Sequence, residues 1–159
     1  MIGQMRVLLR VKDLKLDQAL RAMQAKRAER DAAHRERVAA ENAVAESAAT
    51  YAAREDAIYA DIIGKVIGQD GVDETHGRVI QLQKSHAALE DELERARHVE
   101  ARLEQELQAA TTAYFAAQRM RDKFSMITDD LQTEIDTAAE SREEIEVEDL
   151  FARPRQRVA

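Results

Sequence analysis

Hydrophobic positions in the second half of the chain repeat with the spacing of a coiled coil. If Val79 is position a of a seven-residue repeat, position d is apolar in ten consecutive heptads. Apolar residues spaced three and four apart form one face of a helix that packs against another helix. The d positions are Leu82, Leu89, Ala96, Leu103, Ala110, Ala117, Phe124, Leu131, Ala138 and Ile145. The pattern predicts a helix over about residues 74–150.

The first half of the chain shows the same spacing at its two ends. Leu16, Leu20 and Met23 begin a stripe that Tyr51 and Ile58 continue further along. Between these ends the chain offers mainly alanines, and charged side chains fall in phase with the apolar positions: Arg27, Arg30, His34, Arg37 and Glu41. We therefore predict a helix over about residues 5–63 whose middle is thin and weakly held.

Glycines gather between the two predicted helices. Four of the five lie in the window 64–77, at Gly64, Gly68, Gly71 and Gly77. Glycine permits tight turns and disfavours helix, so this window is predicted to be a tip that reverses the chain. A reversal near residue 69 pairs residue i with about residue 138 − i. The expected fold is all-α, a long antiparallel two-helix coiled-coil hairpin, forming a single elongated domain over 1–159 with a disordered tail at 152–159.

Composition argues against catalysis. Ala, Glu, Lys, Leu and Arg make up about half of the chain, which has one proline, no cysteine and no tryptophan. Such usage is typical of long helices. The four histidines form no i,i+4 pair, and no phosphate-binding loop motif occurs. We expect no enzyme activity, no catalytic residue, no cofactor and no metal.

Charge and hydropathy narrow the range of partners. The net charge of −7 opposes nucleic-acid binding, and no apolar run is long enough for insertion into a membrane. Residues 1–37 carry a net +5, whereas residues 124–159 carry a net −6. The hairpin would bring these two segments together, with Arg6, Arg10 and Lys12 on the basic one. A cytoplasmic location is expected.

Several large apolar residues fall outside the predicted seam. Phe115 and Ile80 take position b and Met126 position f, while Tyr59 and Phe151 are also off the stripe. A two-helix coiled coil has no second core in which to bury them. They are candidate anchors for partner proteins.

The N-terminal run Arg-Val-Leu-Leu-Arg-Val-Lys-Asp-Leu-Lys, at residues 6–15, is followed by Ala-Leu-Arg-Ala-Met-Gln-Ala-Lys-Arg-Ala at 19–28. Together with the unequal hairpin, it resembles the FliJ/YscO family, the central-stalk proteins of bacterial type III secretion and flagellar export. The run favours the injectisome branch.

This resemblance implies a non-enzymatic stalk. The end of the hairpin that bears both termini would enter a hexameric export ATPase, and the tip would face the membrane-embedded export gate. Export chaperones are further implied partners. The chain would be a monomeric hairpin, cytoplasmic and peripherally associated with the export apparatus. The implied ATPase-facing residues are Arg6, Arg10, Lys12, Phe115, Met126 and Phe151, and the implied gate-facing residues are Tyr59 and Ile80.

Three other functions remain open from the sequence. The first is a generic coiled-coil scaffold that has no ATPase partner. The second is a chaperone with coiled-coil arms resembling prefoldin, although the strand pattern needed for its assembly is missing. The third is an amphipathic membrane binder that uses residues 1–37.

Overall fold

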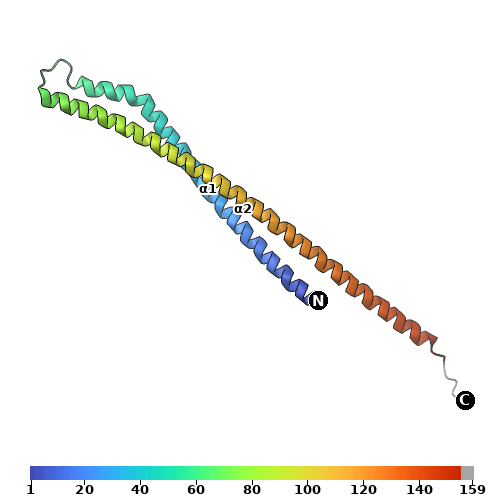
Figure 1. Ribbon diagram of the computed structural model, residues 1–159. Coiled ribbons are helices and arrows are strands. Elements are labelled where there is room, and N and C mark those ends of the chain that lie inside the picture. Colours follow the sequence, from blue (N-terminus) through green and yellow to red (C-terminus); the bar gives the residue numbers. More distant parts are fainter. Residues whose placement is uncertain (155–159) are drawn as a thin grey trace. The chain divides into compact units, whose positions relative to one another are not determined.

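The computed structural model describes residues 1–154, and these form two helices (Figure 1). Helix α1 (Ile2–Ala60) has 59 residues and helix α2 (Gln69–Ala152) has 84. The two helices pack against each other, and the described part of the chain contains no strand. The predicted all-α helical hairpin is confirmed.

Contacts divide the expected single domain into two compact units. Unit 1 combines Met1–Ala22 with the chain from Thr111 onward, and unit 2 is Met23–Ala110. In each unit a segment of α1 runs antiparallel to a segment of α2. Arg6 contacts Gln132 in unit 1, and Arg78 contacts Asp61 in unit 2.

Unit 2 contains the best-buried apolar side chains. Ile58, Val79 and Leu82 form a cluster against which Tyr51 packs. The remaining buried apolar residues also belong to this unit, namely Met23, Ala33, Leu93, Leu103 and Leu107. Val79 and Leu82 are the a and d positions from which the heptads were counted, so the predicted seam of α2 is the face that packs.

Unit 1 has a shallower seam. The α1 residues Ile2, Met5 and Leu9 are half-buried and lie on one helix face, and α2 contributes half-buried Phe124. Thr128 is the buried residue of this unit among those described, and its hydroxyl donates to the carbonyl of Phe124 at 2.7 Å. From residue 133 to residue 152 every α2 residue is exposed.

The predicted pairing of residue i with residue 138 − i agrees closely with some contacts in each unit and differs by several residues from others. It pairs residue 6 with residue 132, and the Arg6 guanidinium donates to Gln132 Oε1 at 2.7 Å. It also pairs residue 26 with residue 112, whereas Lys26 contacts Glu106.

The helix ends differ from the predicted boundaries. The connection spans residues 61–68, shorter than the predicted tip, because Gly71 and Gly77 lie inside α2. Gly64 is the glycine that turns the chain, with φ of +81°, a conformation that disfavours any side chain. Asp70 lies in the first turn of α2, where a negative charge is favoured by the helix dipole.

The outer ends of both helices extend further than predicted. Helix α1 begins at Ile2 instead of residue 5, and α2 continues to Ala152 instead of residue 150. Residues 155–159 of the predicted disordered tail lie outside the described residues. Pro154 follows the end of α2 closely, as expected for a residue that cannot continue a helix.

Candidate partner-binding surfaces

Polar contacts join the start of α1 to α2 in unit 1. Arg121 Nε donates to Asp13 Oδ1 at 2.9 Å, and Lys12 Nζ lies 5.1 Å from the centre of the Phe124 ring. The hydrogen bond to Asp13 and a second one to Asp122 raise the pKa of Arg121. Lys12, Arg121 and Phe124 stand at seam positions. Their contacts therefore help to fix the alignment of α1 against α2 in this unit.

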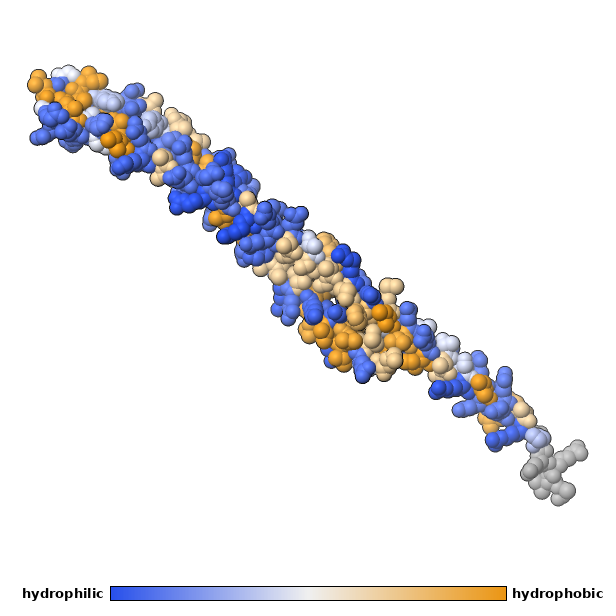
Figure 2. Space-filling model, in the orientation of Figure 1, coloured by the Kyte–Doolittle hydropathy of each residue, from blue (hydrophilic) through white to orange (hydrophobic). Residues whose placement is uncertain are grey.

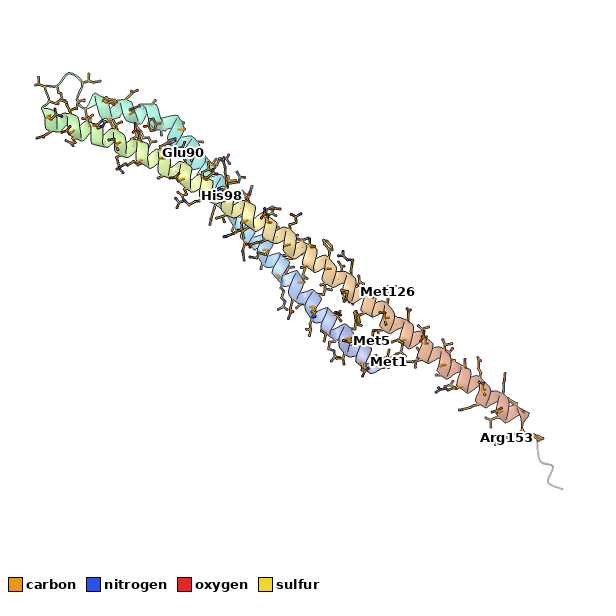
Figure 3. All side chains as sticks on the ribbon, viewed as in Figure 1. Met1, Met5, Glu90, His98, Met126 and Arg153 are labelled. Atoms are coloured by element: carbon orange, nitrogen blue, oxygen red, sulfur yellow. The ribbon has the colours of Figure 1, made fainter. Side chains whose placement is uncertain are left out.

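Unit 1 exposes the apolar residues that were proposed as anchors. Met126 is 67% exposed and Phe151 86%. Phe115 is half-exposed, and its ring centre lies 5.4 Å from that of Tyr114, which faces the seam. Figure 2 shows apolar side chains gathered on the face of unit 1 around the start of α1. Figure 3 labels Met126 on α2 near Met1 and Met5 on the start of α1, and it labels Arg153 at the far end of α2.

The basic residues proposed for this end have different surroundings. Arg10 is exposed, whereas Arg6 donates to Gln132 and Lys12 is half-buried against Phe124. Arg10 therefore presents its charge to solvent, and Lys12 contributes mainly to the seam.

The residues proposed at the tip belong to unit 2. Tyr59 is 42% exposed, while Ile80 is half-buried and so offers less surface than its position b suggested. Two apolar residues of the connection were missed, because the sequence analysis considered only helix positions. Ile63 is 73% exposed and Val66 is fully exposed.

An ion pair closes the helix ends beside the connection. Arg78 donates to Asp61 Oδ2 at 2.8 Å. This hydrogen bond, strengthened by the charge of Arg78, lowers the pKa of Asp61. The exposed residues Ile63 and Val66 therefore lie on a connection whose two sides are joined by this ion pair.

Charged side chains cross the seam in the middle of α1. Lys26 Nζ lies 2.8 Å from Glu106 Oε2, and Arg30 lies 3.2 Å from Glu104. The hydrogen bond from Lys26 lowers the pKa of Glu106, and the hydrogen bonds to Glu106 and Glu29 raise the pKa of Lys26. The stretch expected to be weakly held therefore contains a series of cross-helix pairs.

Glu100 is the centre of this polar seam. It accepts from His34 Nδ1 at 2.7 Å and pairs with the Arg37 guanidinium. The hydrogen bond with His34, followed by that with Arg37, lowers the pKa of the Glu100 carboxyl. Sequence reasoning placed His34 and Arg37 in phase with the core but did not find the glutamate that they share.

Small side chains beside this polar seam leave a groove in unit 2. Its volume is about 710 Å³. It is lined by Glu36, Ala39, Ala40, Ala43, Leu89, Glu92, Arg95, Ala96 and Val99. The groove is the consequence of the alanine-rich middle of α1, where no large side chain fills the space beside α2.

One cluster in unit 2 has the residue types of a hydrolase triad. Ser47 Oγ lies 2.9 Å from His86 Nδ1, and His86 Nε2 lies 3.4 Å from Glu90. Arg54 also donates to Ser47 Oγ at 2.9 Å, and the serine is 7% exposed. Acyl transfer needs free donors for the oxyanion, whereas amides inside a helix are bonded within that helix. The cluster is best explained as a polar link between the helices.

The described residues contain no helix long and apolar enough to cross a bilayer. Residues 1–154 also contain no group of three or more His, Asp or Glu side chains arranged to hold a metal ion. The surfaces of interest are therefore the exposed apolar and charged side chains of the two units.

Comparison with known proteins identifies the family. A family model described as type III secretion protein YscO matches residues 5–153. The chain belongs to the YscO family. It is thus a type III secretion protein, as the resemblance in the N-terminal run had indicated.

The fold also matches a solved member of this family. The crystal structure of type III secretion protein YscO from Vibrio parahaemolyticus is similar to the chain, with a TM-score of 0.84 and 18% sequence identity. The similarity covers 93% of each chain. A search of curated proteins finds no match. At 18% identity, these two chains share the helical hairpin while most of their side chains differ.

Proposed function

We propose that this YscO-family protein is a non-enzymatic central stalk of a type III secretion export apparatus. In this role unit 1 contacts the hexameric export ATPase, and the tip of unit 2 contacts the export gate. The protein would act at the cytoplasmic side of the membrane-embedded apparatus and would also bind export chaperones.

One observation carries the assignment of the ATPase-facing end. Within a chain of the YscO family, unit 1 combines the start of α1 with the last part of α2, and it exposes Phe115, Met126 and Phe151 together with the basic residue Arg10. Aromatic residues, Met and Arg are enriched at the interfaces between proteins relative to the rest of the surface.

The test is the response of the cognate export ATPase to the purified protein. Wild-type chain is expected to raise the ATP hydrolysis rate or the fraction of hexamer measured by sedimentation. The Phe115→Ala/Met126→Ala variant should bind about 30-fold more weakly or worse, since truncating an anchor costs about 2 kcal/mol or more. A Val66→Ala variant, altered at the tip, is the matched control and should act as wild type does.

A wild-type chain that changes neither the rate nor the hexamer fraction would contradict the stalk assignment. The scaffold without an ATPase partner would then be the better explanation.

The tip has a separate test. Tyr59→Ala and Ile63→Ala should weaken binding to the cytoplasmic part of the export gate in pull-down titrations while leaving ATPase stimulation unchanged. Both side chains are exposed on unit 2. Equal loss of gate binding with the Phe115→Ala/Met126→Ala variant would argue against assigning the gate to the tip.

A further inference from the structure

The start of α1 carries a second stripe on the face opposite the seam. The stripe consists of exposed residues spaced three and four apart: Gln4, Val7, Val11, Leu14, Gln18 and Arg21. Val7 is 61% exposed and Leu14 59%. We call these six residues the outer stripe. A helix with apolar stripes on two opposite faces is suited to packing against two neighbours.

The end of α2 carries an unpartnered seam. Helix α1 begins at Ile2, and residues 133–152 of α2 are exposed along their whole length. The a and d positions nevertheless continue there, with Ile135 and Ile145 46% and 57% exposed. We call this set the overhang seam: Ile135, Ala138, Arg142, Ile145, Asp149 and Ala152.

The two surfaces match in length, spacing and charge. In both sets the successive residues are three, four, three, four and three positions apart, from Gln4 to Arg21 in the outer stripe and from Ile135 to Ala152 in the overhang seam. The segment 4–21 has five basic and two acidic residues, whereas the segment 135–152 has one basic and seven acidic residues. Within one chain they cannot meet, because α2 is a continuous helix that leads the overhang away beyond the start of α1.

We propose that these surfaces bind each other between two copies of the chain. The overhang seam of one copy packs in parallel on the outer stripe of the second, and the second copy returns the same contact. The overhang seam is a direct continuation of the α2 face that packs on α1. Each α2 would therefore contact its own α1 first and the partner's α1 beyond it, around a two-fold axis near the N-termini. Because Arg6 lies beside Gln132, the first turns of the two α1 helices would meet at about residues 132–135 of each α2. The association therefore requires residues 1–4 of each chain to move off that face.

The alignment brings suitable residues together. It places Leu14 opposite Ile145 and Val7 opposite Ala138, so apolar side chains meet at the d positions. In a parallel coiled coil the g position of one helix faces the following e position of the other. This rule pairs Arg10 with Glu146.

A second pair follows from the same alignment, Asp17 with Arg153. Asp17 already lies 3.0 Å from Arg21 on the surface of α1, so its carboxylate is held on the side where the overhang would lie. Both predicted pairs join opposite charges, and the alignment was set only by the apolar spacing.

A second copy is favoured over an anionic membrane as the occupant. Lipid headgroups would bind the basic residues of α1 but would repel the acidic overhang and leave its seam uncovered. Association of two copies covers the outer stripe and the overhang seam together. It differs from the monomeric hairpin expected from the sequence.

The first measurement is the mass of the full chain by light scattering from about 1 to 100 μM, at 50 mM and 500 mM salt. The expected result is a rise at low salt toward twice the 17.9 kDa of one chain, reversed at high salt because charge pairs are screened. A mass that stays at one chain across the range would overturn the proposal, as would binding to anionic vesicles without any self-association.

Charge reversal supplies the decisive test. Arg10→Glu and Glu146→Arg each place like charges at both contacts of the dimer and should weaken self-association about tenfold or more. Mixing the two variants restores opposite charges at both contacts, so the mixture should form a mixed dimer with wild-type affinity. Lys84→Glu, an exposed reversal in unit 2, is the control and should not weaken association.

A mixture that associates no better than either variant alone would overturn the pairing. Because the chain has no cysteine, Leu14→Cys and Ile145→Cys variants provide an independent readout of the alignment. Mixed under mild oxidation they should form a disulfide-linked heterodimer, whereas Val66→Cys mixed with Ile145→Cys should not. Equal yields in the two mixtures would contradict the proposed contact.

Discussion

Glu100 shows how a charged side chain can serve a coiled-coil seam. It stands at position a, where an isolated carboxylate would lose hydration without compensation. His34 and Arg37 supply that compensation from α1, and their hydrogen bonds lower the pKa of the carboxyl. Because these partners come from one turn of α1, the contact specifies which turns of the two helices lie together.

The lowered pKa of Glu100 predicts a pH-dependent contribution to stability. A carboxyl whose pKa falls on folding stabilises the folded state above its ordinary value of 4.5, and this contribution is lost as pH falls through the folded-state pKa. Glu100→Gln should therefore lower the melting temperature at pH 7, and the difference from wild type should shrink toward zero at pH 3. Thermal unfolding followed by circular dichroism checks this. A Glu74→Gln control, exposed in unit 2, should show little difference at either pH.

Apolar burial differs sharply between leucines at different positions. Leu82 belongs to the Ile58 cluster and is 9% exposed, whereas Leu14 is 59% exposed. Leu82→Ala should lower the free energy of unfolding by about 2–3 kcal/mol, near the lower end for a buried leucine. Leu14→Ala should change it by less than about 0.5 kcal/mol. Chemical denaturation of both variants at high salt checks the contrast, and equal losses would contradict the assigned burial.

At the scale of the elements, two glycines close in sequence have opposite roles. Gly64 turns the chain with φ of +81°, while Gly77 lies inside α2 with open space where a Cβ would be. Gly64→Ala should destabilise the protein by about 1 kcal/mol, and Gly77→Ala should stabilise it by about 0.5–1 kcal/mol. Opposite shifts in the melting temperature are the expected result. Shifts of the same sign would show that one glycine is wrongly placed.

These glycines also show what sequence can and cannot predict about the elements. The unbroken d positions from Leu82 onward required a long helix, and the glycine window required a reversal nearby. The window could not give the boundary, because glycine is tolerated in a helix whose neighbours pack well. Thr75 and Val79, both buried, provide that packing around Gly77.

The sequence also predicted only part of the candidate surfaces. Met126 and Phe151 fall off the heptad and are exposed, as expected, because a two-helix coiled coil has one seam. Ile80 is half-buried, because a residue beside a seam position can be partly covered by the facing helix. The Glu100 cluster was missed, since a heptad pattern records apolar spacing and does not pair charges from two helices.

For the whole molecule, one surface is proposed to have two uses. The ATPase-facing residue Arg10 also belongs to the proposed contact between copies. If both proposals hold, self-association and ATPase binding exclude each other, so added ATPase should dissociate the dimer in a concentration-dependent way. Light scattering of mixtures reports this competition directly, and a stable complex of the dimer with the ATPase would contradict it.

The distribution of buried apolar side chains gives the two units different resistance to local opening. Among residues 1–154, the eight buried apolar residues all belong to unit 2, whereas the segments of unit 1 meet along half-buried side chains. Amides exchange with solvent through local unfolding, which is easier where fewer apolar contacts are lost. Hydrogen exchange at high salt should therefore be faster by about tenfold or more in residues 2–22 and 111–152 than in residues 75–107. Low salt should slow exchange selectively in residues 4–21 and 135–152 if the proposed dimer forms, because the association covers those residues. Uniform protection of both units at high salt would contradict the division, since equal protection requires equal burial.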